Sequence, residues 1–207
     1  TTAQGERLDL HLPEYAGETL QRLVKQRRFT SHWKQLIVNT HRWLLFIRLE
    51  QVPQVPDIIS KPLRELAISS PSTRSGGDEG SSSNLPYDLW LIELLQMMCY
   101  SRRAYVQESR QRPEVVVLLS CWDELQLEEE KVSPEELLQG RLPLVHSFIT
   151  ENWDEGERSI LGLSSQEKEL SEDEADQDFI DRGLADIGYI VTNTGERRGD
   201  LTLPLLV

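Results

Sequence analysis

The order of apolar and polar residues predicts strands and helices that alternate along the chain. Residues 6–12 alternate polar and apolar side chains, which is typical of a half-buried strand, and a turn signal follows at 13–17. The runs 43–49 and 114–120 are almost continuously apolar, which favours strands buried on both faces of a parallel sheet. We predict that 43–49 is a central strand of that sheet.

Between these strands the apolar residues recur at helical spacing. From Thr19 to about Lys34 the pattern predicts a helix with a basic polar face and a break near Phe29. A longer helix is predicted over 87–106, and its apolar face consists of Leu91, Leu94, Leu95, Met98 and Cys99. The pair at 112–113, Arg followed by Pro, ends that segment before the strand at 114–120.

The last third of the chain begins with a helix-start signal. Ser133, Pro134 and Glu136 form the pattern of a capping box with proline in the first turn, so we predict a helix to about Asn152. A short strand follows at 159–163. Residues 189–206 are interpreted as two short strands or loops around a turn that contains glycine.

This succession predicts an α/β protein with a mainly parallel, doubly wound sheet and helices on both faces. We expect a single domain over 1–207, and no internal repeat is visible. Residues 51–86 hold most of the Ser, Gly and Pro and are interpreted as a flexible insertion rather than a domain boundary. Residues 166–188 are interpreted as an acidic helix or loop.

Composition narrows the possible partners. With 22 basic and 35 acidic residues the net charge is −13, which argues against nucleic-acid binding, because that affinity depends on clustered Lys and Arg. The basic clusters gather in residues 1–48, and 124–136 and 167–181 are strongly acidic. No apolar run reaches the roughly 18 residues of a membrane span, and no signal-peptide pattern is present, so we expect a cytoplasmic protein without membrane contact.

The two cysteines, Cys99 and Cys121, each lie in an apolar run. This placement favours buried, reduced thiols over a disulfide. The four histidines show no zinc-ligand spacing with either cysteine, and no hydrolase signature occurs.

In a sheet of this kind ligands bind beyond the carboxyl ends of the strands, so the residues that follow each strand are the candidates for function. After the first predicted strand come Glu14, Gly17 and Glu18. Glu14 and Gly17 resemble the D-x-x-G motif of GTPase switch II, with Glu in place of Asp. The resemblance implies a carboxylate near Mg²⁺ and a glycine amide on the γ-phosphate, with Glu18 ordering the attacking water. A plain turn is the alternative.

The strand at 114–120 is followed by Ser120-Cys121-Trp122-Asp123, which is similar to the guanine-binding N-K-x-D motif. The resemblance implies that Asp123 accepts hydrogen bonds from guanine. The Asn and Lys of that motif are replaced by Ser120 and Cys121, which puts guanine specificity in question. The alternative for Asp123 is a helix cap, and Trp122 is interpreted as packing.

Ser164 and Ser165 follow the strand at 159–163 and resemble the S-A-x loop of GTPases, whose backbone amide meets the guanine oxygen. Ordinary turn chemistry is the alternative. The order of strands and motifs resembles a Ras-like P-loop GTPase domain from its third strand onward, without its first strand and phosphate-binding loop. The runs 43–49 and 120–125 look like the double-GTPase proteins of bacterial conflict and defence systems.

No G-x-x-x-x-G-K-S/T loop occurs, so the side chains that grip phosphates and Mg²⁺ in this family are missing. The resemblance places Thr1 or Thr2 at the end of switch I, and we assign Thr2 as the magnesium ligand that it implies. The start at Thr1-Thr2, with no initiator Met, indicates a piece of a longer protein. GTP hydrolysis is therefore expected only if an upstream phosphate-binding loop is supplied.

Two functions follow from these observations. The first is a switch domain that binds GTP or GDP with Mg²⁺, within a larger bacterial signalling or defence protein, and acts on a protein partner or effector domain. The second is a degenerate GTPase-like interaction module that binds no nucleotide. A receiver-type signalling domain is a third possibility, but the first strand is not followed by the paired Asp residues that it requires.

Overall fold

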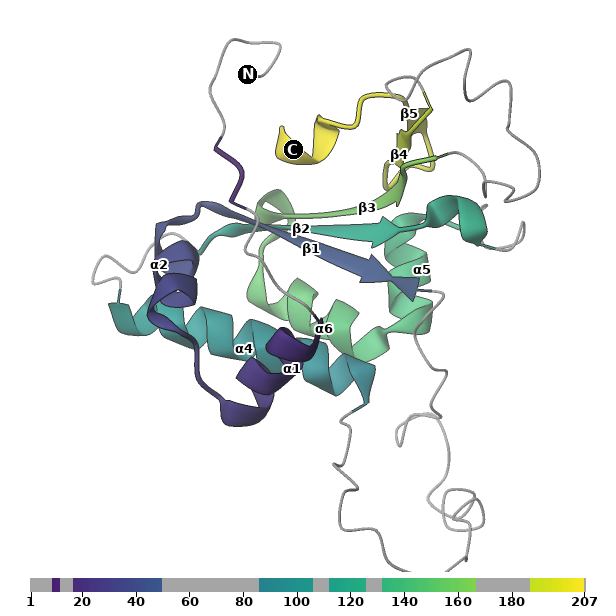
Figure 1. The fold of residues 1–207 in the computed structure, drawn as a ribbon. Coiled ribbons are helices and arrows are strands. Elements are labelled where there is room, and N and C mark those ends of the chain that lie inside the picture. The colour runs from purple at the N-terminus through teal and green to yellow at the C-terminus, as the bar shows by residue number, and fades with distance from the viewer. Residues whose placement is uncertain are drawn as a thin grey trace, which may run out of the picture.

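The computed structural model describes residues 9–11, 17–49, 86–105, 112–125, 132–166 and 187–206. The helices are α1 (Gly17–Gln26), α2 (Ser31–Asn39), α4 (Tyr87–Tyr105), α5 (Pro134–Arg141) and α6 (Pro143–Asn152). The strands are β1 (Arg42–Arg48), β2 (Glu114–Ser120), β3 (Arg158–Ser164), β4 (Tyr189–Val191) and β5 (Arg197–Arg198). Short 3₁₀ turns are η2 (Trp122–Glu124), η4 (Glu155–Glu157) and η6 (Leu203–Leu205). The fold is mixed α/β (Figure 1).

The five strands form one sheet in the order β1-β2-β3-β4-β5. The first three are parallel, and β4 and β5 add on in antiparallel orientation. The prediction of a mainly parallel sheet is therefore confirmed for the three long strands, which occupy nearly the predicted positions. The two short strands at 189–206 also form, and Gly195 in the turn between them takes a positive φ of 77° that suits glycine.

The prediction that 43–49 is a central strand buried on both faces is wrong for the described sheet. β1 lies at its edge, with only β2 beside it. Trp43 and Ile47 are buried against the helices, but Phe46, which points to the opposite face, is 48% exposed. A continuous apolar run does not distinguish an edge strand from a central strand, because strands at both positions bury at least one face against a core.

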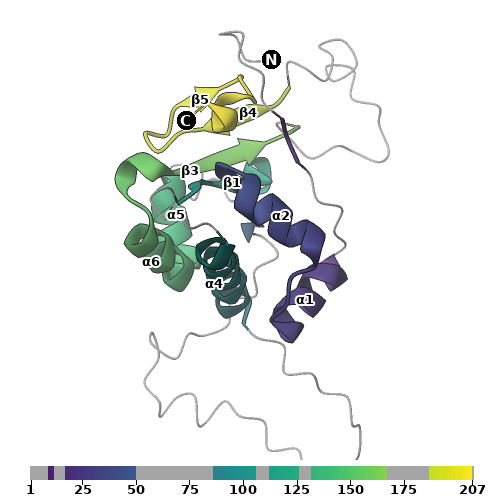
Figure 2. The same ribbon diagram turned by 90° about the vertical axis from the view of Figure 1, so that its left-hand side faces the viewer.

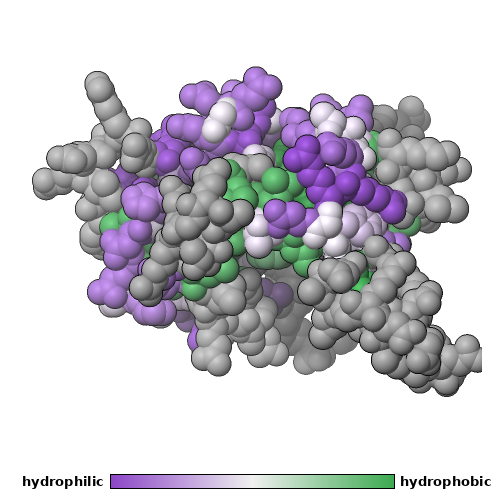
Figure 3. Space-filling view, turned by 90° about the horizontal axis from the view of Figure 1, so that it is seen from above, coloured by the Kyte–Doolittle hydropathy of each residue, from purple (hydrophilic) through white to green (hydrophobic). Residues whose placement is uncertain are grey.

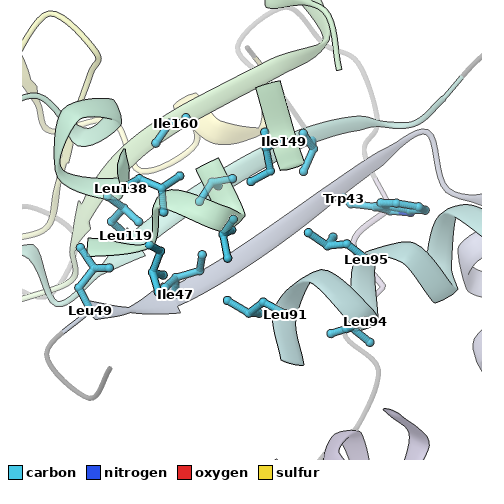
Figure 4. Close-up of a cluster of buried hydrophobic side chains, with 14 of the residues drawn as sticks. Trp43, Ile47, Leu49, Leu91, Leu94, Leu95, Leu119, Leu138, Ile149 and Ile160 are labelled. Carbon is cyan, nitrogen blue, oxygen red and sulfur yellow. The ribbon is translucent and has the colours of Figure 1, made fainter. Parts of the chain in front are cut away.

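All five described α-helices lie on the same side of the sheet, with α1 and α2 packed on α4, so helices on both faces are not found within the described residues (Figures 1 and 2). Figure 4 shows how side chains from β1, β2 and β3 meet those of α4, α5 and α6 in the main core. The predicted apolar side of α4 is confirmed, because Leu91, Leu94 and Leu95 are buried there and Met98 and Cys99 pack partly buried.

A second, smaller core lies on the other face of the sheet. Val116, Leu118, Leu161 and Ile190 are buried there, with the C-terminal turn η6 packed against them through Leu203. Arg42 fixes this C-terminal segment by donating a hydrogen bond to the Leu205 carbonyl. Figure 3 views the molecule from this side and shows apolar residues near the centre, with hydrophilic residues around them.

The predicted helix over 19–34 is interrupted, as expected near Phe29, and becomes α1 and α2. Arg27 takes a left-handed φ of 48°. Its amide donates to the Val24 carbonyl, and the Arg28 amide donates to the Leu23 carbonyl, which is the hydrogen-bond pattern of a Schellman cap. Thr30 then caps α2 by accepting a hydrogen bond from the Trp33 amide.

The single helix predicted from Ser133 to Asn152 is wrong, because it is split into α5 and α6 at Leu142 and Pro143. Proline at 143 cannot continue the hydrogen-bond ladder of α5, so it begins α6 instead. The predicted capping box is confirmed, since Ser133 accepts from the Glu136 amide and Glu136 accepts from the Ser133 amide.

Several predictions concern residues that the structure does not describe. Of the strand predicted at 6–12 only 9–11 are described, and they form no regular element. The insertion at 51–86, apart from its last residue, and most of the acidic segment at 166–188 lie outside the described residues. Within the described part of the chain, no helix is both long and apolar enough to cross a membrane.

Candidate functional site at the carboxyl ends of the strands

The parallel register brings the ends of β1, β2 and β3 to one edge of the sheet. Arg48 pairs in register with Ser120, and Ser120 with Leu163, so the residues that follow these strands are neighbours in space. This edge is where ligands bind in open α/β sheets. We call the residues Arg48, Ser120, Cys121, Asp123, Glu124, Ser164 and Ser165 the strand-end site.

The turn after β2 has a strained start. Cys121 takes a left-handed conformation, with φ of 58° and ψ of 44°, which is rare for a residue with a side chain. The chain then forms η2, in which the Glu124 amide donates to the Cys121 carbonyl over 3.1 Å. Left-handed residues without compensation cost about 1–2 kcal/mol, so the surrounding packing must hold this turn in place.

Trp122 supplies that packing. Its side chain is completely buried beneath the turn and lies on Gly162 of β3. A Cβ atom at position 162 would lie 2.5 Å from a ring carbon of Trp122, so the indole fits only because residue 162 is glycine. The interpretation of Trp122 as a packing residue is confirmed. Its role is to anchor the turn that carries Asp123.

Two side-chain contacts tie β1 to the end of β2. The Ser120 hydroxyl donates to the Ile47 carbonyl over 3.3 Å. At the next position along β1, the Arg48 guanidinium donates to a carboxylate oxygen of Glu124 over 2.6 Å. Ser120 therefore braces the strand ends, and Glu124 is engaged by an ion pair.

Asp123 differs from Glu124 in its contacts. Its side chain is half-buried, and no hydrogen bond or ion pair joins its carboxylate to another side chain or amide in the part of the chain that the structure describes. With respect to the described residues, this carboxylate on a fixed turn therefore has its acceptor capacity available for a ligand. Asp123 is accordingly the residue of this edge best placed to recognise a hydrogen-bond donor.

The thiol of Cys121 has low reactivity. Burial raises the pKa of its thiol, and the negative charges of Glu124 and Asp123 raise this pKa further, against an opposing effect of Arg48. The thiol is thus protonated at neutral pH and is a poor nucleophile. Both cysteines are free, as predicted, although they are half-buried rather than fully buried.

The third strand contributes Ser164 and Ser165. Ser164 is fully buried at the end of β3, and Ser165 is exposed just beyond it. Gly188 lies against this turn, since a Cβ there would be 3.1 Å from the Ser164 carbonyl oxygen and 2.7 Å from a methyl of Leu201. Of these two residues, only Ser165 is thus accessible to a ligand.

The other predicted site residues are not brought to this edge by any described contact. Gly17 and Glu18 begin α1, a helix that packs against α4. Thr2 and Glu14 lie outside the described residues. Among the residues that are described, no group of three His, Cys, Asp or Glu side chains is arranged to hold a metal ion.

The structure adds three residues that the sequence analysis did not single out, namely Arg48, Glu124 and Gly162. Arg48 and Glu124 form the ion pair that links two strand ends. The only sequence signal for Arg48 was a single charge at the end of an apolar strand. Gly162 interrupts an apolar strand, which is a known sign of a close approach by another group.

A family model described as Double-GTPase 1 matches residues 1–207. No curated protein and no solved structure matches the chain.

Proposed function

Because the chain belongs to the Double-GTPase 1 family, we propose that its strand-end site binds the base of a guanine nucleotide in a GTPase-type switch domain. The observation that supports this most is the state of Asp123. It is a half-buried carboxylate without a described protein partner, on a turn anchored by Trp122 at the edge where α/β sheets bind ligands.

Guanine offers two donors on one edge, the ring N1–H and the exocyclic amine. A carboxylate accepts both, one with each oxygen, and such charge-assisted bonds are stronger than neutral ones. A backbone amide of the turn at Ser164 and Ser165 would donate to the guanine oxygen. Ser120 braces β1 against β2 and so fixes the position of Asp123 through the backbone.

The phosphates require further residues. The family resemblance assigns Glu14, Gly17 and Glu18 to switch II and Thr2 to switch I, with Mg²⁺ offsetting phosphate charge when it is bound. The chain contains no Walker-type loop, so we propose that one is supplied by sequence upstream of Thr1. Hydrolysis, and the movement of residues 14–28 that would follow it, depend on that loop.

The base contact is tested by Asp123→Asn in a protein that includes the upstream loop. Asparagine presents a donor where xanthine has a carbonyl, so the variant should lose affinity for GTP by at least about tenfold and gain affinity for xanthosine triphosphate. Glu151→Gln is the matched control, because it makes the same carboxylate-to-amide change at an exposed position of α6, outside the strand-end site. Equal nucleotide preference in wild type and Asp123→Asn would show that Asp123 does not contact the base.

A second candidate function is a degenerate, nucleotide-free interaction module within the same larger signalling or defence protein. It is favoured by Cys121, whose thiol stands where the guanine-binding motif has a lysine and cannot supply a positive charge. In this case the thermal stability of the protein would not change when GTP and Mg²⁺ are added, whereas a ligand that binds the native state raises it.

A further inference from the structure

We propose that α1, α2 and the turn between them form a docking surface for an acidic segment of a partner protein. We call this the basic surface, and it consists of the exposed side chains of Arg22, Lys25, Arg28 and His32. It shares no residue with the strand-end site, so it stands independently of the proposed nucleotide function.

The charge distribution along the chain first marks this region. Thirty-five of the 207 residues are acidic, yet none lies between Thr19 and Leu49. The same stretch carries seven of the 22 Lys and Arg residues. A protein of net charge −13 thus has one stretch of sequence without acidic residues, which begins directly after Glu18 in the first turn of α1.

The fold turns these side chains outward. Leu23 and Val24 of α1 and Ile37 of α2 are buried in the main core, and both helices pack against α4. Their opposite sides therefore face solvent, and Figure 2 shows the two helices on the outside of the molecule, beside α4. Arg22 and Lys25, three residues apart, lie on the same side of α1.

The turn that joins the helices is held firmly. Arg27 closes the Schellman cap of α1, and its guanidinium donates to Glu93 of α4 over 2.6 Å. Thr30 caps the next helix. Arg27 thus serves as an anchor, and Arg28 beside it is presented on a backbone of defined geometry. A surface that is ordered before binding loses less entropy when a partner docks.

The size of the surface and the net charge together favour an acidic polypeptide. A nucleic acid or an anionic membrane extends beyond the basic surface and would meet the acidic remainder of the protein. Repulsion acts over a Debye length of about 8–10 Å at physiological salt. A short acidic segment contacts the basic surface alone, and its carboxylates suit the bidentate geometry of arginine.

The experiment measures binding of a short fluorescent peptide of alternating Glu and Ser at low and at high salt. The double variant Arg22→Glu with Lys25→Glu is compared with the wild-type protein. Its matched control is Arg103→Glu with Arg198→Glu, which changes the net charge equally at exposed positions elsewhere. Circular dichroism confirms that each variant is folded.

We expect the wild type to bind the peptide, the first variant to bind at least about tenfold more weakly, and the control to stay within about twofold, with affinity falling as salt rises. The proposal is overturned if the peptide does not bind or if both variants weaken binding equally. It is also overturned if an oligothymidylate or vesicles of phosphatidylserine bind the wild type more tightly than the peptide.

Discussion

At the scale of single residues, the contact between Trp122 and Gly162 is the one on which the strand-end site depends most. Replacing Gly162 with alanine places a methyl group 2.5 Å from the indole, so either Trp122 or β3 must shift. Overpacking of this kind costs about 1–3 kcal/mol. We therefore predict that Gly162→Ala lowers the free energy of unfolding by that amount, as measured by urea denaturation.

Gly140→Ala is the matched control for this substitution. Gly140 lies in α5, and a Cβ there would have no neighbour within 4 Å. Alanine is the better helix former by roughly 1 kcal/mol, so this variant should be as stable as the wild type or more stable. Equal destabilisation by the two substitutions would refute the anchoring role of the Trp122–Gly162 contact.

At the scale of elements, Arg102 of α4 holds the end of α2. Its Nη1 atom donates to the carbonyls of Ile37, Val38 and Thr40 over 3.0, 3.0 and 2.7 Å. These lie at the C-terminal end of α2, where carbonyls lack partners within the helix and a positive charge is favourable. Partial burial lowers the pKa of Arg102, but an arginine stays charged at any physiological pH.

We predict that Arg102→Met lowers the free energy of unfolding by about 1.5–3 kcal/mol, because it removes charge-assisted hydrogen bonds from half-buried carbonyls. The adjacent Arg103→Met changes an exposed residue and should stay within about 0.5 kcal/mol of the wild type. Hydrogen exchange should show faster opening of α2 in Arg102→Met alone. Unchanged exchange in α2 would contradict the assignment of Arg102 as its cap.

The elements also show what the sequence reveals and what it does not. The strands at 114–120 and 158–164 and the helix at 87–105 were predictable, because their apolar periodicity is set by local geometry. The edge position of β1 was not predictable, since the order of strands in a sheet depends on contacts between segments that are distant in sequence. The division of the helix at Leu142 was not predicted, although Pro143 is a sequence signal for the start of a new helix.

Part of the strand-end site could also be predicted from the sequence. Asp123 could be identified because it follows a buried strand, and such positions collect at one edge of a parallel sheet. The ion pair between Arg48 and Glu124 could not be identified from the sequence, because it joins residues 76 positions apart. Likewise, only the folded sheet shows that Gly162 makes room for Trp122.

At the scale of the whole molecule, the basic helices and the strand-end site occupy different parts of one α/β fold. The sheet fixes the ends of β1, β2 and β3 in register, and α4 carries both α1 and α2 on its outer side. This arrangement suits a domain that binds a nucleotide at the strand-end site and contacts a partner protein at the basic surface. Nucleotide binding at the strand-end site is therefore the property to measure first.

The first test is to titrate fluorescent analogues of GTP and ATP, with Mg²⁺, into this chain and into a longer protein that includes the proposed upstream phosphate-binding loop. We predict that the longer protein binds the GTP analogue at least about tenfold more tightly than the ATP analogue, and that this chain alone binds weakly. Absence of binding by the longer protein would contradict the account and leave the interaction module as the function of the domain.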